Sequence, residues 1–432
     1  MLQNVASIVF IDRSFNSLVS IAQYKTFNRI FKKEVFMKKR VLCLVLVFVM
    51  LLPTMIVPAS AYSTGMPQGI QLYVGPRSAY GGSTMYEEYT NDDIAELVGA
   101  SSEFVMNCIN APINYDLDGN AIITDDILSR MNESYVFHGT SKSALVTSYG
   151  NMLDDYASSA ATYCNLQVLA DAQVELAQRL ISEDSSVSIW FCFPVIAYFP
   201  CALEYEDAFT DYVNYIKNEM TSSTWRNNVR GFYWATETVG WSATFTSNAS
   251  SNFGNPHVML MDAMGDLVKG TYGKEFMWMP YTTTTAGVGL DKNDVRMGYV
   301  ANRSTIFDYV LLQPGYYWDT NDVECLRRVA ASATNNKVYN YSASSSYTNS
   351  TVVGGGKVSG AADIGVVMEI DDKIVNGSEE HAASYYNNTY YEYTLKFGSI
   401  KSNVPIVFYA GAQPSLMNHT VVFNYVKNFL NY

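Results

Sequence analysis

The run VSIWFCFPV, residues 187–195, is almost continuously apolar and lies between two longer amphipathic segments, 142–182 and 203–221. A short strand without polar alternation is buried on both faces, as in a parallel sheet that helices cover on each side. Parallel neighbours also need long crossover connections, and the flanking segments have the length of crossover helices. This run therefore predicts one strand of an α/β sheet, with a helix before and after it.

The same pattern recurs in both directions along the chain. Alternation of strand and helix over about 350 residues is typical of a (β/α)8 barrel. We therefore predict an α/β fold, a TIM-like barrel. The strand-like runs are 71–75 (QLYVG), 104–111 (FVMNCINA), 135–140 (YVFHGT), 187–195, 231–236 (GFYWAT), 276–281 (FMWMPY), 308–314 (DYVLLQP), 365–370 (GVVMEI) and 404–410 (VPIVFYA).

Nine runs are one more than the barrel needs. The run 104–111 leads into the turn sequence DLDG at 116–119, so we assign it to a hairpin or loop insertion and number the other eight as strands. The stretch 338–361, rich in Ser, Thr, Asn and Gly, is interpreted as a long loop. The expected barrel thus carries an extra hairpin and long loop insertions.

An export signal is expected near the N-terminus. Residues 38–40 are basic, residues 41–57 are almost wholly apolar, and Ala-Ser-Ala at 59–61 is a pattern that signal peptidase accepts. A membrane anchor is the alternative, but Pro53 interrupts the apolar run and the cleavage pattern ends it. We predict a signal peptide that is removed before Tyr62.

The domain boundaries follow from this signal. Because Met37 begins a complete signal peptide, residues 1–36 are interpreted as sequence upstream of the true start, and residues 37–61 as the signal peptide. Residues 62–432 then form a single (β/α)8-like domain. We expect this domain to be secreted, with attachment to the bacterial cell surface as an alternative.

The charge of the exported part excludes some partners. Residues 1–61 carry 8 of the 28 Lys and Arg and 2 of the 41 Asp and Glu, which leaves 20 basic and 39 acidic residues and a net charge of −19. Such a charge repels nucleic acid and anionic membrane surfaces. We therefore expect a glycan ligand, with no nucleic acid and no membrane partner after signal cleavage. The oligomeric state stays open.

No metal or cofactor is expected from the sequence. The four His residues lack metal-ligand spacing, and no phosphate loop, dinucleotide motif or GxSxG sequence occurs. The five cysteines beyond residue 61 are odd in number and form no CxxC pair, which argues against a zinc site or a disulfide scaffold. Residues 114–125 partly resemble a calcium loop, but a β-turn is the preferred interpretation.

Two glutamates are the candidate catalytic residues. In the eight-strand numbering Glu237 follows the fourth strand and Glu369 ends the seventh, at the carboxyl end of the barrel where active sites lie. A glycosidase needs such a carboxyl pair, with one group as general acid and base and the other as nucleophile. The alternative is that both merely cap helices or pair with Arg.

Aromatic residues gather at the strand ends. The chain has 33 Tyr and 6 Trp, and aromatic faces pack against the apolar face of a sugar ring while neighbouring polar groups bind its hydroxyls. At least half of these aromatics must belong to the core, because side chains alternate in direction along a strand. The candidate substrate-binding residues are Tyr233, Trp278, Tyr281, Gln313, Tyr316 and Asp371.

The order of four segments resembles one bacterial family, the domain of unknown function 4855. The segments are 231–237 (GFYWATE), 276–281 (FMWMPY), 312–317 (LQPGYY) and 365–371 (GVVMEID), and the likeness spans roughly residues 70–430. The family is similar to TIM-barrel glycoside hydrolases. The resemblance therefore implies this fold, and it points to Glu237 and Glu369 as the site residues.

Three hypotheses for the function remain open. The first is a secreted glycan-active hydrolase that uses Glu237 as general acid and base and Glu369 as nucleophile. The second is a non-catalytic carbohydrate-binding protein on the same barrel, and the third is a surface adhesin. A separation of more than about 12 Å between the two carboxyls, or a carboxylate locked to an Arg, would exclude the hydrolase, since the geometries that it needs span about 5–9.5 Å.

Overall fold

The chain divides into two units, residues 1–59 and 60–432, and the computed structural model describes residues only in the second. The expected signal peptide, the upstream segment and the run 135–140 lie outside the described residues. The described residues are 65–78, 84–86, 88–108, 113, 115–124, 126–127, 165–196, 199–239, 256–282, 297–298, 300–301, 306–320, 323–338, 362–411 and 413–431.

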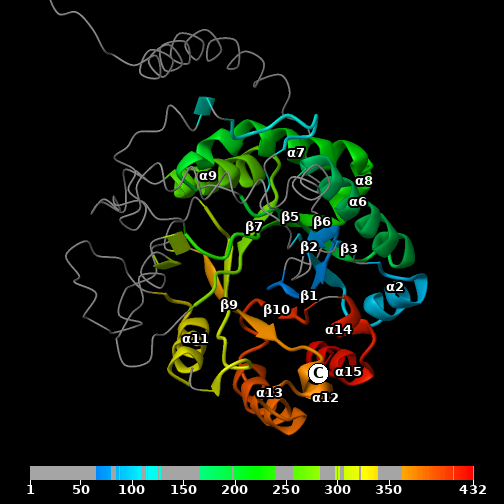
Figure 1. The fold of residues 1–432 in the computed structure, drawn as a ribbon, viewed down its shortest axis with the longest axis vertical. Helices are drawn as coiled ribbons and strands as arrows, with labels where there is room; N and C mark the ends of the chain where they lie inside the picture. Colours follow the sequence, from blue (N-terminus) through cyan, green and yellow to red (C-terminus); the bar gives the residue numbers. More distant parts are fainter. Residues whose placement is uncertain are drawn as a thin grey trace, which may run out of the picture. The chain divides into compact units, whose positions relative to one another are not determined.

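Eight parallel strands close into a barrel, which Figure 1 shows with helices around its outside. Each strand pairs with its neighbours in chain order, and β1 closes the ring by pairing with both β4 and β10. The predicted (β/α)8 fold is therefore confirmed. The strands are β1 (Gln68–Tyr73), β4 (Glu103–Asn107), β5 (Ser188–Phe193), β6 (Val229–Trp234), β7 (Glu275–Trp278), β8 (Tyr309–Leu312), β9 (Asp363–Glu369) and β10 (Ile406–Tyr409).

Helices follow most of the strands. None of the described helices combines the length and the apolar composition that crossing a membrane requires. The helical segments are α2 (Asn91–Val98), α6 (Leu166–Glu183), η1 (Phe199–Tyr205), α7 (Glu206–Glu219), α8 (Ser222–Asn227), α9 (Pro256–Gly265), η2 (Asp266–Thr271), α11 (Val323–Asn335), α12 (Lys373–Asn376), α13 (Ala383–Gly398), α14 (Gln413–Met417) and α15 (Thr420–Leu430).

One strand was assigned wrongly from the sequence. The run 104–111 contains most of β4, the second barrel strand, which pairs with β1 and β5. The turn that suggested a hairpin does form, since Asp116 Oδ1 accepts hydrogen bonds from the backbone of Asp118 and Asn120, but it follows a barrel strand. An antiparallel hairpin occurs instead after β1, as β2 (Pro76–Ser78) and β3 (Thr84–Tyr86). Apart from Val338, the expected loop 338–361 lies outside the described residues.

An aromatic layer joins the barrel to its surrounding helices. The ring of Phe193 on β5 lies 5.2 Å from Phe232 on β6, 5.7 Å from Phe276 on β7 and 5.3 Å from Phe209 on α7, measured between centroids. Large aromatic side chains bury the most area per residue and dominate the energetics of cores. The outward-facing side of these three strands is therefore held by the helix that crosses it.

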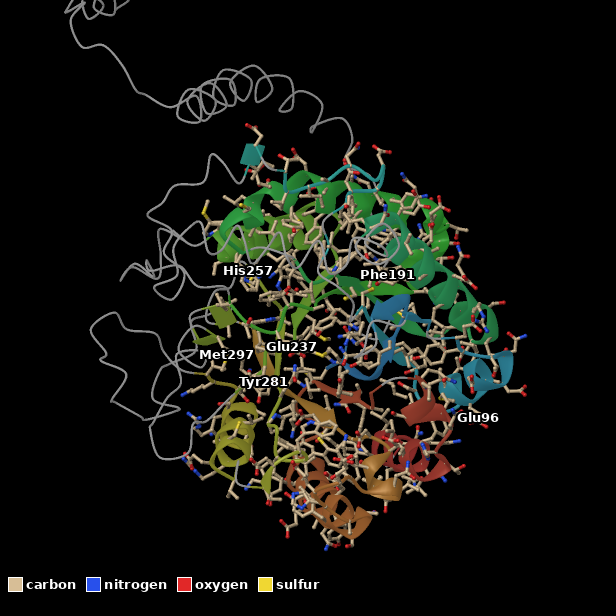
Figure 2. All side chains as sticks on the ribbon, in the orientation of Figure 1. Glu96, Phe191, Glu237, His257, Tyr281 and Met297 are labelled. Carbon is tan, nitrogen blue, oxygen red and sulfur yellow. The ribbon has the colours of Figure 1, made fainter. Side chains whose placement is uncertain are left out.

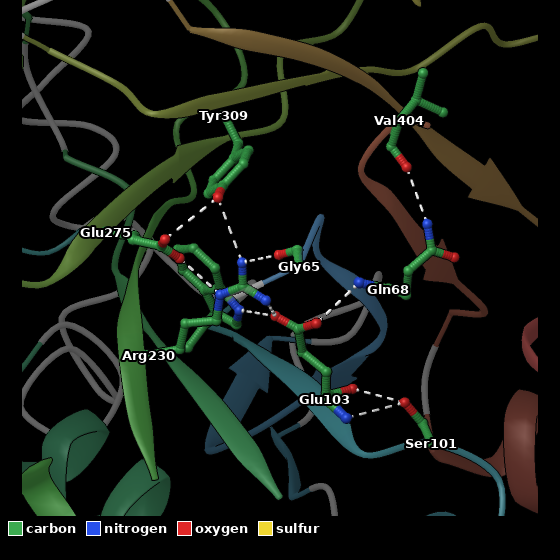
Figure 3. A network of polar contacts seen from close by, with 9 residues as sticks. Gly65, Gln68, Ser101, Glu103, Arg230, Glu275, Tyr309 and Val404 are labelled. Carbon is green, nitrogen blue, oxygen red and sulfur yellow. Dashed lines mark hydrogen bonds and ion pairs between the residues drawn. The ribbon is translucent and has the colours of Figure 1, made fainter. Parts of the chain in front are cut away.

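A buried ionic network closes the amino-terminal end of the barrel, as Figure 3 shows. Glu103 and Glu275 are the first residues of their strands, and Arg230 is the second of β6, so all three meet at this end. Arg230 Nη1 lies 2.9 Å from Glu103 Oε1, and its Nε lies 2.6 Å from Glu275 Oε2. Burial alone would lower the pKa of Arg230, but the two carboxylate charges outweigh it and raise that pKa.

Neighbouring side chains complete the hydrogen bonds of this network. The indole nitrogen of Trp190 donates to Glu103 Oε1 at 2.6 Å, and the hydroxyl of Tyr309 donates to Glu275 Oε1 at 3.3 Å. The guanidinium carbon of Arg230 also lies 5.3 Å from the centroid of the Trp190 ring. Because its buried charges are paired and hydrogen-bonded, the network fills the barrel floor without an isolated ion.

Gly231 is required by the close approach of β6 to its neighbours. A Cβ at this position would lie 2.1 Å from the carbonyl oxygen of Glu275 and 2.5 Å from the ring of Trp190. We expect Gly231→Ala to lower the free energy of unfolding by about 3 kcal/mol, because packed backbone cannot move aside. Urea denaturation would measure this, with Gly270→Ala, where nothing lies within 4 Å, as the control. A Gly231→Ala protein as stable as the wild type would contradict this geometry.

Candidate active site

The two candidate glutamates both lie at the carboxyl end of the barrel. Glu237 follows β6 and Glu369 is the last residue of β9, the fourth and seventh barrel strands in chain order. The connection after β7 is tied to this end, because the backbone N–H of Tyr281 donates to the carbonyl of Glu237 at 3.1 Å. Figure 2 shows Glu237 and Tyr281 close together. The predicted numbering of these two strands therefore holds although β4 was misassigned.

Glu237 is partly buried and held by a neutral partner. The side-chain nitrogen of Gln313 donates to Glu237 Oε1 at 2.9 Å and to the carbonyl of Met279 at 2.9 Å, which fixes the amide between them. The other carboxyl oxygen has no hydrogen-bond partner among the described residues. Burial raises the pKa of Glu237, and the hydrogen bond from Gln313 offsets part of that rise. Glu237 thus keeps one oxygen available to a ligand.

Glu369 is buried and surrounded by hydrogen-bond donors. The residue as a whole is 3% exposed. The backbone N–H of Gly315 donates to Oε2 at 2.8 Å, the indole nitrogen of Trp318 donates to Oε1 at 3.1 Å, and the hydroxyl of Tyr393 lies 3.4 Å from Oε2. These donors orient both oxygens and leave the carboxyl little freedom to rotate.

The two carboxyls are electrostatically coupled. Burial raises the pKa of Glu369 to about 7, the donors from Gly315 and Trp318 oppose that rise, and the negative charge of Glu237 adds to it. Among the described residues, neither carboxyl forms an ion pair with a cation. Within the described residues, neither glutamate is therefore locked to an Arg. Of the two, Glu369 is the carboxyl that titrates near neutral pH.

A cluster of tyrosines lies beside the carboxyls. The hydroxyls of Tyr73 and Tyr409, at the ends of β1 and β10, are hydrogen-bonded to each other, and their rings meet edge to face with centroids 5.8 Å apart. Tyr233 on β6 is fully buried, and the charge of Glu237 adds to the effect of burial in raising the pKa of both Tyr233 and Tyr73. These phenols stay protonated and supply hydroxyl groups near the carboxyl pair.

The structure brings only part of the predicted binding set to this place. Tyr233, Gln313 and Tyr281 lie around Glu237, and Tyr281 is 40% exposed. Asp371 lies near Tyr409. Burial is the main cause that raises the pKa of Tyr409, and the charge of Asp371 adds to it. Its carboxylate is already occupied, by Lys373 Nζ at 2.8 Å and by the hydroxyl of Tyr317 at 2.9 Å. Asp371 is therefore placed beside the site with its charge paired.

Trp278 and Tyr316 are engaged elsewhere. Trp278 is fully buried, its ring stacks on Phe307 with centroids 5.5 Å apart, and its indole nitrogen donates to the carbonyl of Thr236 at 2.8 Å. The hydroxyl of Tyr316 donates to Glu392 on α13 at 3.0 Å. Both side chains use their polar groups within the fold, so the structure does not place either of them with the carboxyl pair.

Sequence reasoning missed several residues of the site. Tyr73 and Tyr409 end strand-like runs, but only the closure of β1 against β10 brings them together. Gly315 stands in the quoted segment 312–317 and Trp318 directly follows it, yet nothing in the sequence links them to Glu369. Asn107, which ends β4 and is 3% exposed, has an amide oxygen without a partner among the described residues. The position of single tyrosines at the ends of strand-like runs was the available sequence signal for these site residues.

The raised pKa of Glu369 predicts a pH dependence of stability. An ordinary Glu has a pKa of 4.5 and Glu369 one of about 7, so between these values the folded state holds a proton that the unfolded chain has released. The contribution of Glu369 to stability is then full below pH 4.5 and is lost as the pH rises through 7, by about 3 kcal/mol in total. Urea denaturation at pH 5 and pH 8 should show a smaller fall in Glu369→Gln than in the wild type. Equal falls in both proteins would contradict the buried, protonated carboxyl.

Comparison with known proteins adds little to this geometry. No protein-family model matches the chain, and no curated protein matches its sequence. Among solved structures, the chain is similar to a GH18 chitinase from the chitin utilization locus of Flavobacterium johnsoniae. The identity is 8% and the TM-score 0.36, over 85% of this chain and 94% of that chain. A likeness this distant says nothing about function, and the fold assignment rests on the strand pairing itself.

Proposed function

We propose that this protein is a secreted glycan-active hydrolase in which Glu237 and Glu369 act as a pair at the mouth of the barrel. The observation that carries the proposal is their shared environment. Two carboxyls with pKa values raised by burial interact at the carboxyl ends of the fourth and seventh strands, and no described cation neutralises either. Paired carboxyls of unequal surroundings are what acid and nucleophile roles require.

The hydrogen bonds support one division of roles between the two glutamates. Glu369 has donors on both oxygens, and a carboxylate accepts all of them, whereas a protonated group would turn an O–H toward one of the donors. Because the pKa of Glu369 is about 7, the carboxylate and the protonated carboxyl are both populated at neutral pH. Glu237 has one oxygen free of described partners, which can present a proton to a ligand. We therefore assign Glu369 as nucleophile and Glu237 as general acid and base.

The proposed reaction has two steps, formation of a covalent glycosyl-enzyme and its hydrolysis. The Glu369 carboxylate attacks the anomeric carbon while the bond to the glycosidic oxygen breaks, and Glu237 gives its proton to that oxygen. In the second step Glu237 takes a proton from water, whose oxygen attacks the same carbon and releases Glu369. Gln313 positions Glu237 in both steps, because its amide bridges Glu237 Oε1 and the carbonyl of Met279.

The surroundings support a sugar as the ligand. The exposed ring of Tyr281 offers an apolar face beside Glu237, and the hydroxyls of Tyr73 and Tyr409 lie at the same end of the barrel. A pyranose has apolar faces and a rim of hydroxyls, which matches an aromatic surface next to fixed polar groups. The proposed resemblance to the domain of unknown function 4855 family implies the glycoside-hydrolase-like fold and does not name a substrate.

Export is part of the proposal and has its own test. If residues 37–61 act as a signal peptide, the protein recovered outside expressing bacteria should begin at Tyr62. N-terminal sequencing of the secreted product would show this directly. An Ala59→Arg, Ala61→Arg variant should block processing, because signal peptidase accepts small residues at these positions. A product that retains residues 37–61 and stays with the membrane would contradict the signal peptide and support an anchor.

A turnover screen tests the hydrolase itself. Residues 62–432 would be incubated with a panel of neutral polysaccharides and aryl glycosides, and release of reducing ends or of the aryl group would be followed. We expect turnover of at least one member of the panel. Binding of a glycan without any turnover would contradict the proposal and would favour a non-catalytic carbohydrate-binding protein.

A further inference from the structure

A groove lies between α13 and α15 on the outside of the barrel. Figure 1 shows these helices next to α12, outside the ring of strands. The groove has a volume of about 650 Å³, which is within the range of small-molecule and glycan sites. The segment after α13 leads to the amino-terminal end of the barrel. There the carbonyl of Lys401, a lining residue of the groove, accepts a hydrogen bond from the side chain of Gln68 at the start of β1. The groove is therefore separate from the mouth.

Tyrosine rings form the walls of this groove. Tyr390 on α13 and Tyr425 on α15 stack with their centroids 5.3 Å apart and their planes 22° apart. Tyr391, one residue further along α13, is 63% exposed. The hydroxyl of Tyr425 donates to the side chain of Asn387 at 3.2 Å. Apolar ring faces thus alternate with amide and hydroxyl groups along one surface.

The groove lacks carboxylates although the protein is acidic. The whole chain has 41 Asp and Glu and a net charge of −13, yet no acidic residue is among the described residues that line the groove. Lys401 is the cation of this lining, and its ammonium already donates to the carbonyl of Phe429 and lies 5.2 Å from the centroid of that ring. An uncharged ligand with apolar faces and polar edges matches this surface better than a charged one.

The hydroxyl of Tyr390 supplies a second and independent observation. Tyr390 lines the groove and is 5% exposed, and its hydroxyl has no hydrogen-bond partner among the described residues. A buried polar group without a partner destabilises a protein unless something satisfies it. A ligand hydroxyl or a ring oxygen in the groove would provide that partner. The orphaned group therefore indicates a polar ligand rather than a purely apolar one.

We propose that this groove is a second carbohydrate-binding site, which holds a neutral polysaccharide chain. Stacked and exposed tyrosines contact the apolar faces of the sugar rings, and the Tyr390 hydroxyl binds a polar edge. Because the groove lies away from the mouth, it anchors the protein to polymeric substrate instead of presenting a bond for cleavage. The proposal goes beyond the hydrolase activity and does not require it, since binding here involves neither Glu237 nor Glu369.

Affinity electrophoresis tests the groove. Native gels would contain xylan, galactomannan, hydroxyethyl cellulose or starch, and retardation of the protein would give its affinity for each. We expect at least one polysaccharide to retard the wild type, and the double variant Tyr391→Ala, Tyr425→Ala to bind it at least ten-fold more weakly. Val323→Ala on α11, which also removes an exposed apolar side chain (57% exposed), is the matched control and should bind like the wild type.

Further variants separate this site from the mouth and from a protein interface. Glu237→Gln should keep its retardation, and the double variant should keep wild-type turnover of a small aryl glycoside. Tyr390→Phe should bind more weakly yet unfold at the same or a higher urea concentration, because it removes an unsatisfied hydroxyl. Retardation that is absent in the wild type, or unchanged in the double variant, would overturn the proposal. So would a dimer in sedimentation that the double variant dissociates, since a second copy would then occupy the groove.

Discussion

Glu237→Gln and Glu369→Gln are each expected to lose turnover by about a thousand-fold or more on a glycoside that the wild type cleaves. Each substitution keeps the size and shape of the side chain but removes the group that titrates. Glu237→Gln cannot donate a proton to the glycosidic oxygen, and Glu369→Gln cannot attack the anomeric carbon. Initial rates at saturating and at limiting substrate would separate these losses from changes in binding.

The two variants should differ in their dependence on the leaving group. A dinitrophenolate departs without a proton, so Glu237→Gln should recover much of the cleavage step on dinitrophenyl glycosides. Glu369→Gln should be equally inactive on all of them, because every substrate needs the nucleophile. Glu96→Gln, an exposed position on α2, is the control and should retain full activity. A reversed pattern, with recovery in Glu369→Gln, would show that the assigned roles are exchanged.

Arg230→Met is expected to be the most destabilising single change at the barrel floor, with a loss of about 3–5 kcal/mol in the free energy of unfolding. The substitution leaves Glu103 and Glu275 close together without their cation. The side chain of Glu103 is only 6% exposed, and that of Glu275 is 28% exposed. Each carboxylate then has to be neutralised or moved into water, and both responses cost folding energy. Urea denaturation of the residues 62–432 protein at pH 7 would measure the loss.

A second variant shows whether the unpaired charge is the cause. Adding Glu103→Gln to Arg230→Met removes one of the two abandoned carboxylates while the amide can still accept from Trp190, which donates to Glu103 at 2.6 Å. The double variant should therefore be more stable than Arg230→Met alone. If Arg230→Met lowered the free energy of unfolding by less than about 1 kcal/mol, the ion pairs of the network would contribute no more than solvent-exposed salt bridges do, which would contradict this account.

The apolar strand pattern predicted most of the fold because buried parallel strands differ from helices in length and composition. The strand β4 was set aside because the DLDG turn that follows it resembles a hairpin signal, and local turn chemistry carries no information about pairing with β1. The two glutamates could be found because each stands at the carboxyl end of an apolar run that reads as a buried strand, where a barrel places its active site. The expected resemblance to the domain of unknown function 4855 family points to the same positions, but no protein-family model matches the chain.

The rest of the site depends on tertiary structure that local patterns do not reveal. Tyr73 and Tyr409 are 336 positions apart and meet only because the barrel closes. Trp278 pairs in register with Trp234, and the orientation of β7 turns its ring toward Phe307 in the layer outside the barrel. Tyr316 lies in the turn after β8, and its hydroxyl donates to Glu392 on α13. Side-chain direction at a strand end is set by the register of the whole sheet.

The most direct test of the account is the release of reducing ends from the preferred polysaccharide by three folded proteins at equal concentration. These are the wild type, Glu237→Gln and Glu369→Gln, each checked by circular dichroism and by its thermal unfolding midpoint. Turnover in the wild type, with about a thousand-fold loss in both variants, is the result that the carboxyl pair predicts. Glycan binding without turnover in the wild type, or turnover that survives in both variants, would contradict it.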